Sequence, residues 1–201
     1  MSIKAAVGEK KDYASFNKNV RSSDEVPLYK DENDVVRAFA TVNYHYFKKI
    51  ATGNTLVVEP EYLYIDQDYQ GSILNQLLVK KIVKIILAHP LKRKFIMGEL
   101  YPSSYISYCK YGKNVWSLRR NDTPEDIRDL LGALQYKKSK SLEQESQGII
   151  YLHTLPKSSL NKEKFLKRET YKNYVKMNPN WEEGFALLGL VELGWNTFFY
   201  Q

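Results

Sequence analysis

Cysteine is nearly absent from this chain of 201 residues, because Cys109 is the only one. A single cysteine cannot form a disulfide within the chain, and it cannot supply a zinc site made of several cysteines. No run of about 18 or more uncharged apolar residues occurs, which argues against a transmembrane segment. The first residues, MSIKAAVGEKKDYASF, contain no apolar core of signal-peptide length. We therefore expect a cytoplasmic protein.

The positive charge of the chain is spread along it rather than concentrated. Lysine and arginine number 30 against 23 acidic residues, which gives a formal net charge of +7, and no arginine-rich run occurs. This balance permits binding to an anion such as a nucleotide cofactor, an anionic membrane surface or RNA, but it specifies none of them. Nucleic acid is thus a permitted partner that the sequence does not favour.

Composition predicts an irregular arm followed by one folded domain. Residues 1–34 are mostly polar, carry charges of both signs and show little periodicity, as expected of an irregular N-terminal arm. Residues 35–201 are long enough to bury one good core, and they predict a single α/β domain with a mixed sheet. A helical insertion is predicted at about 123–135. Thr123 is its expected N-cap and Pro124 its first residue, and an apolar face indicates a packing helix.

The stretch Glu59–Ala88 is the centre of the predicted fold. Its first part, through Ile65, is rich in tyrosine, leucine and isoleucine and predicts a strand. A polar turn, Asp66–Gly71, leads into a helix whose apolar residues recur at helical spacing. The free N–H groups at the start of such a helix, with its dipole, form a ready anion site. An ordinary strand-to-helix connection explains the same pattern.

The remaining elements follow from periodicity, caps and breaker residues. A half-buried strand is predicted at Val35–Phe47, with His45 as a surface histidine on its more polar face, and a hairpin turn at Thr52–Asn54 leads into the next strand. The other predicted elements are a strand at Phe95–Tyr101, a short tyrosine-rich helix from Pro102 to Gly112, a strand at Ile149–Leu155, a basic helix at Asn161–Lys176 and a strand inside the sheet at Phe185–Leu193. The lysines of the basic helix indicate a solvated face in preference to an anion-binding one.

The order of these elements resembles that of the GNAT superfamily of acyl-CoA-dependent N-acyltransferases. The sequence DYQG, which ends at Gly71, stands in the place of that family's frequent EYRG, while Ile73 and Asn75 stand where small residues are usual. The segments PSSY and NPNWEEG are similar to those of a poorly characterised branch. The resemblance implies a twisted sheet with a central strand–loop–helix unit and helices on both faces. It also implies acetyl-CoA or a longer acyl-CoA as co-substrate, without a metal. The residues implied to hold this co-substrate are Ile65, Gln70, Gly71, Ser72, Ile73 and Leu74.

The resemblance also implies catalytic residues. The spacing Tyr-x-x-x-Gly at Tyr108–Gly112 matches the family's general acid, and a phenol can protonate a departing thiolate. Tyr105 and Tyr111 compete for this role. Glu59 and Glu61 lie where the family often has a base for an amine acceptor, here of unknown identity. Two solvent-facing carboxylates on either side of a proline are the alternative interpretation.

Two other classes of function compete with an acyltransferase. A non-catalytic module with this scaffold would bind a partner protein, RNA or an acyl ligand, as the departures in the loop and the basic helix suggest. A thiol hydrolase would use Cys109 with His45, His89 or His153. No orienting motif surrounds these histidines, and a lone cysteine is usually buried filler, so this class is disfavoured.

Overall fold

The computed structural model describes residues 17, 20–48, 53–66, 81–112, 114–139, 148–151 and 165–194. The chain divides into two compact units. The first contains Met1–His45 with Val58–Pro90, and the second contains Tyr46–Val57 with Leu91–Gln201.

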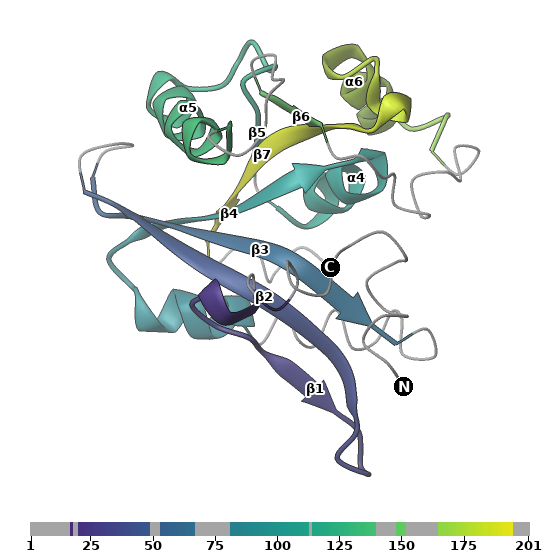
Figure 1. Cartoon of the computed structure of the whole chain (residues 1–201). Coiled ribbons are helices and arrows are strands. Elements are labelled where there is room, and N and C mark those ends of the chain that lie inside the picture. The colour runs from purple at the N-terminus through teal and green to yellow at the C-terminus, as the bar shows by residue number, and fades with distance from the viewer. Residues whose placement is uncertain are drawn as a thin grey trace. The chain divides into compact units, whose positions relative to one another are not determined.

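A long twisted hairpin dominates the first unit (Figure 1). Its strands are β2 (Val36–Phe47) and β3 (Thr55–Ile65). The residues of both strands nearest the turn are assigned to the second unit. Gly53 and Asn54 at that turn have φ angles of 77° and 46°, the left-handed conformation that tight hairpin turns require. The predicted strand and the turn at these two residues are confirmed.

A short strand extends the hairpin within the segment predicted to be an irregular arm. This strand, β1 (Leu28–Lys30), pairs antiparallel with β2, and Glu25 forms an isolated bridge with Val42. The prediction of an irregular arm is therefore wrong for these residues. The segment lacks a strong apolar pattern because β1 is an edge strand, and backbone pairing rather than side-chain burial orders it.

Antiparallel pairing on both sides of one strand organises the second unit. The strands are β4 (Arg93–Leu100), β5 (Val115–Trp116), β6 (Ile149–Tyr151) and β7 (Phe185–Leu193). β7 lies between β4 and β5, and β6 also pairs with β7. β7 is buried along most of its length, which confirms the prediction that it lies inside the sheet.

Helices cover both faces of this part of the sheet. The helices are α4 (Pro102–Tyr111), α5 (Glu125–Ser139) and α6 (Glu169–Met177), and a 3-10 turn, η4 (Trp181–Glu183), precedes β7. Successive side chains of a strand point to opposite faces, so Leu188 and Leu190 of β7 lie on one face and Leu187 and Val191 on the other. The first pair packs with α5 and the second with α4 and α6. The predicted α/β class, with helices on both sheet faces, is confirmed.

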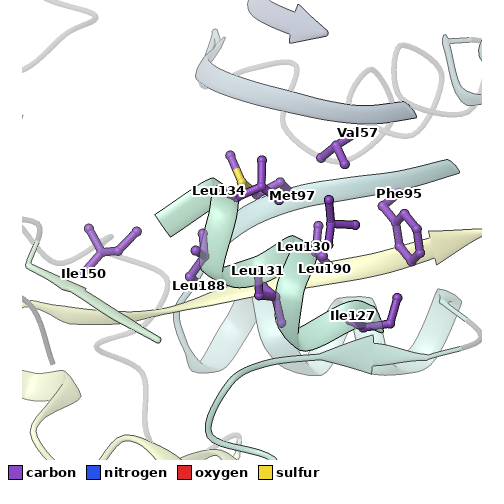
Figure 2. Close-up of a cluster of buried hydrophobic side chains, with 10 residues drawn as sticks. All are labelled: Val57, Phe95, Met97, Ile127, Leu130, Leu131, Leu134, Ile150, Leu188 and Leu190. Carbon is purple, nitrogen blue, oxygen red and sulfur yellow. The ribbon is translucent and has the colours of Figure 1, made fainter. Parts of the chain in front are cut away.

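The core under α5 is formed by fully apolar side chains (Figure 2). Ile127, Leu130, Leu131 and Leu134 of α5 are all at most 1% exposed, which confirms the predicted apolar face. Their partners from the sheet are Val57, Phe95, Met97, Ile150, Leu188 and Leu190. Burying such side chains contributes about 1.5–3 kcal/mol each, so this cluster is a main source of stability in the second unit.

Two predicted helix starts differ from the observed ones. α5 begins at Glu125, one residue after the predicted start at Pro124, and the Thr123 hydroxyl donates to the Ser117 carbonyl at 2.7 Å. The basic helix is described from Glu169, the start of α6, and ends at Met177. Its predicted cap at Asn161 lies outside the described residues, as does the part of the β6 prediction after Tyr151. No described helix combines the length and apolar character needed to cross a bilayer.

We predict that Gly112→Ala destabilises the protein by about 1–3 kcal/mol, as overpacking does. Gly112 ends α4 at a φ of −92°, so its conformation does not require glycine, but its surroundings do. A Cβ there would lie 2.4 Å from Val191 Cγ1 and 2.8 Å from the Tyr108 carbonyl oxygen. Urea denaturation measures the change.

Gly132→Ala is the matched control for this substitution. Gly132 lies within α5, and a Cβ there would meet no atom within 4 Å. Alanine favours a helix over glycine by up to about 1 kcal/mol, so this variant should be neutral or more stable than the wild type. Equal destabilisation by both substitutions would contradict the packing account.

Candidate functional site

A buried carboxylate paired with a histidine is the main polar feature of the first unit. Glu59 of β3 is 5% exposed, and its Oε2 lies 2.7 Å from Nε2 of His45 on β2. The His45 side chain is 21% exposed, so the imidazole lies between the buried carboxylate and solvent. The prediction of a surface histidine is therefore wrong, and so is the interpretation of Glu59 as a solvent-facing carboxylate.

Glu61, the second predicted base, has a different environment. Its side chain is exposed, although it lies only two residues from Glu59 on the same strand. An exposed carboxylate keeps its hydration and its ordinary acidity more readily than a buried one. The structure thus separates the two carboxylates that the sequence could not distinguish: Glu59 is buried and contacts His45, whereas Glu61 is exposed.

The pairing of the two hairpin strands brings Glu59 and His45 together. The Asp66 N–H donates to the Arg37 carbonyl at 2.7 Å, and the Tyr62 N–H donates to Thr41 Oγ1 at 3.0 Å. β2 and β3 are neighbours in the sheet, and side chains of neighbouring strands can touch. The contact between His45 and Glu59 is of this kind.

Ion pairs hold the end of β3 that precedes the predicted cofactor loop. Arg37 lies 3.0 Å from Asp66 and 2.7 Å from Asp31 through two different nitrogens of its guanidinium. This guanidinium lowers the pKa of Asp31 below its ordinary value. Ile65, the first predicted cofactor-binding residue, is half-buried immediately before this bridge. The other five, Gln70 to Leu74, lie outside the described residues.

Tyr108, the predicted general acid, lies in the second unit on α4. Its ring is half-buried beside Gly98 of β4, where an added Cβ would be 3.8 Å from the ring and 3.9 Å from the hydroxyl oxygen. Burial raises the pKa of the Tyr108 hydroxyl. The phenol consequently stays protonated at neutral pH, as a proton donor must.

The two competing tyrosines differ from Tyr108. Tyr105 is buried, and its ring packs against that of Tyr174 with centroids 5.4 Å apart. Desolvation also raises the pKa of Tyr105, and its neighbours belong to the core beneath α4 and α6. Tyr105 therefore serves packing. The side chain of Tyr111 lies outside the described part of the structure.

The thiol of Cys109 has the wrong electrostatic environment for a nucleophile. Burial raises the pKa of Cys109, although a hydrogen bond with Tyr105 and the charge of Arg120 act in the opposite direction. Catalytic cysteines instead have a lowered pKa, because the thiolate is the reactive form. This observation speaks against a thiol hydrolase. Among the residues that the structure describes, no cluster of three or more His, Cys, Asp or Glu side chains could hold a metal ion.

Comparison with known proteins gives matches only among solved structures. No protein-family model and no curated protein matches the chain. An acetyltransferase from Vibrio fischeri is 17% identical, with 44% of this chain and 70% of that chain covered and a TM-score of 0.32. A GNAT family acetyltransferase from Elizabethkingia anophelis with acetyl-CoA bound is 15% identical over 61% of this chain and 74% of that one, with a TM-score of 0.37. A structure described as a bacterial toxin is 20% identical, with 66% of this chain and 82% of that chain covered and a TM-score of 0.38.

We predict that Cys109 reacts several-fold more slowly with iodoacetamide at pH 7.5 than an exposed cysteine in a short peptide. Its raised pKa leaves less thiolate at this pH, and only the thiolate reacts. The rate should continue to rise above pH 9, where the thiol begins to ionise. Mass spectrometry of the alkylated protein gives the rate. Rapid alkylation at pH 7 would contradict the assignment of Cys109 as an inert packing residue.

Proposed function

We propose that this protein is an acyl-CoA-dependent N-acyltransferase that transfers an acyl group to an amine. The observation that carries the proposal is the buried Glu59 carboxylate, 5% exposed and 2.7 Å from the His45 imidazole. It lies on the strand that leads into the loop for which the sequence resemblance implies acyl-CoA binding. An amine acceptor has to lose a proton in order to attack, and this pair supplies a proton acceptor on that strand.

The reaction divides into three linked changes of bonding. The amine loses a proton to the base, and its nitrogen lone pair forms a bond to the acyl carbon. The bond between that carbon and sulfur breaks, and its electron pair leaves with the sulfur as a thiolate. Tyr108 then donates its phenolic proton to the thiolate and regains one from solvent. The proposed base is the pair of Glu59 and His45. Glu61 is the weaker candidate for the base because its side chain is exposed.

The acyl-CoA site is proposed for the end of β3 and the loop that follows it. In this proposal Ile65 lies beside the pantetheine arm, and the backbone around Gln70, Gly71, Ser72, Ile73 and Leu74 receives the diphosphate. The Arg37 bridge to Asp31 and Asp66 supports the proposal, because it fixes the strand end from which the loop starts. Free backbone N–H groups at a helix start bind phosphates without a metal.

We expect acetyl-CoA to raise the melting temperature of the protein. A ligand at 100 times its dissociation constant stabilises the folded state by about 2.7 kcal/mol, which amounts to roughly 5–10 °C for a chain of this size. Differential scanning fluorimetry with acetyl-CoA, a longer acyl-CoA and AMP as control measures this shift. If no acyl-CoA shifts the transition at millimolar concentration, the proposed function is wrong.

We expect Tyr108→Phe to lower kcat by about 100-fold and to leave KM for acyl-CoA nearly unchanged. Loss of a general acid typically costs this much, whereas the aromatic ring and its packing remain. Steady-state kinetics of thiol release measures both constants. Tyr136→Phe is the control, because Tyr136 is 65% exposed near the end of α5 and should tolerate the loss of its hydroxyl. Equal rates for wild type and Tyr108→Phe would assign the acid elsewhere.

A non-catalytic binding module is the second candidate, and one observation favours it. Lys167, Arg168, Lys172 and Lys176 in and before α6 are all exposed, so this surface offers positive charge to an acidic protein or RNA. Lys172 already lies 3.5 Å from Glu169, which reduces the net charge of the surface. Binding through it would weaken steeply with added salt.

A further inference from the structure

The two members of the His45–Glu59 pair are not equivalent. Glu59 lies almost entirely inside the protein, with a side chain 7% exposed, whereas the His45 side chain is three times more exposed at 21%. A substrate that arrives from solvent therefore reaches the imidazole more easily than the carboxylate. The member that touches the substrate is, on this geometry, the histidine.

The atoms in contact determine which nitrogen of the imidazole can accept a proton. Glu59 Oε2 faces Nε2 at 2.7 Å, and an ionised carboxylate only accepts hydrogen bonds. Nε2 must then carry the hydrogen, which leaves the lone pair on Nδ1. When Nδ1 takes up a proton, the ring becomes a cation beside the buried carboxylate, and this charge pair stabilises the protonated form.

The chemistry of the two side chains favours the same assignment, because histidine is the side chain that most often acts as a general base in enzymes. Other acidic groups lie nearby on described segments. They are Glu61 further along β3, Asp24, whose carboxylate accepts the Tyr44 N–H, and Glu25, which accepts from the Tyr44 hydroxyl and contacts Lys81. None of these three is as buried as Glu59.

We propose that His45, through Nδ1, is the residue that takes the proton from the acceptor amine, and that Glu59 is a positioning residue that holds the imidazole. This inference rests on the proposed acyltransferase function. In the step, an N–H bond of the protonated amine breaks, the proton moves to Nδ1, and the electron pair left on nitrogen forms the bond to the acyl carbon. The nitrogen then carries a positive charge and loses its second proton to solvent as the amide forms. The sulfur of the acyl-CoA leaves with the electron pair of the broken C–S bond. Such a base is needed for an aliphatic amine, which is protonated at neutral pH.

The test compares pH–rate profiles of the full-length protein and five variants, of which Glu59→Asp is the conservative rescue of Glu59→Gln. Acetyl-CoA is the acyl donor, and benzylamine, spermidine and lysine methyl ester are the probe amines. His45→Gln keeps an N–H that can reach Glu59 but has no nitrogen able to accept a proton. Glu59→Gln removes the carboxylate. The controls are His89→Gln, a histidine next to the helical residues 81–88, and Glu32→Gln, an exposed carboxylate in the turn before β2.

Wild-type kcat should rise with pH as the base loses its proton, and this rise should depend on His45. His45→Gln should lose this rise and about 100-fold in kcat. Glu59→Gln should lose about 10-fold in kcat at nearly constant KM for the amine, as expected of a positioning residue. Glu59→Asp should recover part of that loss. Both controls should match the wild type. All variants must keep the wild-type melting temperature and its increase on addition of acetyl-CoA. A loss of kcat then reflects catalysis and not a failure to fold or to bind the co-substrate.

The possible failures are distinguishable. If wild-type protein binds no acyl-CoA, the proposed function is wrong and this inference falls with it. If it binds acetyl-CoA and transfers the acetyl group, but His45→Gln keeps the wild-type pH–rate profile, the role of His45 is wrong and the acyltransferase function stands. If it binds acetyl-CoA but acylates none of the three aliphatic amines, the assignment of a base for such amines is wrong. If His45→Gln fails to fold, His45→Asn replaces it under the same criteria.

Discussion

The antiparallel pairing of β7 with β4 is the interaction on which the second unit depends. Seven residue pairs, from Lys94–Leu193 to Leu100–Leu187, join the two strands along almost their whole length. β7 is buried on both faces, so its alternate side chains enter two separate cores. If this ladder were lost, α5 on one face and α4 with α6 on the other would lose their common support. Tyr108 depends on it indirectly, because α4 carries the tyrosine and packs on β7 through Gly112.

The first unit is organised differently, since it places a charge where apolar packing would be more stable. Removing an ionised carboxylate from water costs several kcal/mol, and a partner offsets this only in part. An apolar pair in place of Glu59 and His45 could pack between the two strands without this desolvation cost. A buried, hydrogen-bonded charge pair in the hairpin is thus better explained by chemistry than by stability. The ion pairs of Arg37 at the other end of the hairpin lie nearer the surface and fix the strand end.

Local sequence signals were enough to predict most of the fold. Alternation predicted β2, a four-residue apolar face predicted α5, and the apolar run Phe185–Leu193 predicted β7 in the sheet interior. These predictions succeeded because burial and periodicity are properties of short segments. β1 was missed because an edge strand needs little apolar pattern. The start of α5 was predicted one residue early, at Pro124, because cap residues locate a helix end only to within a residue or two.

The candidate site was harder to predict than the fold, since its geometry depends on strand register. Glu59 was singled out from a resemblance, but its burial was not foreseen, because Pro60 and Glu61 beside it suggested an exposed strand. The partner, His45, lies on the other arm of the hairpin, and a shift of one residue would have turned it to the opposite face. No pattern within either strand states this register, so the sequence alone did not reveal the pair.

A crystal structure with bound acetyl-CoA tests the central claim most directly. The account predicts that the diphosphate accepts hydrogen bonds from backbone N–H groups between Gly71 and Leu74. It also predicts that the acetyl group lies on the side of β3 where His45 meets Glu59. A diphosphate bound elsewhere on the chain, or an Ile73 side chain that fills the position of the diphosphate, would contradict it.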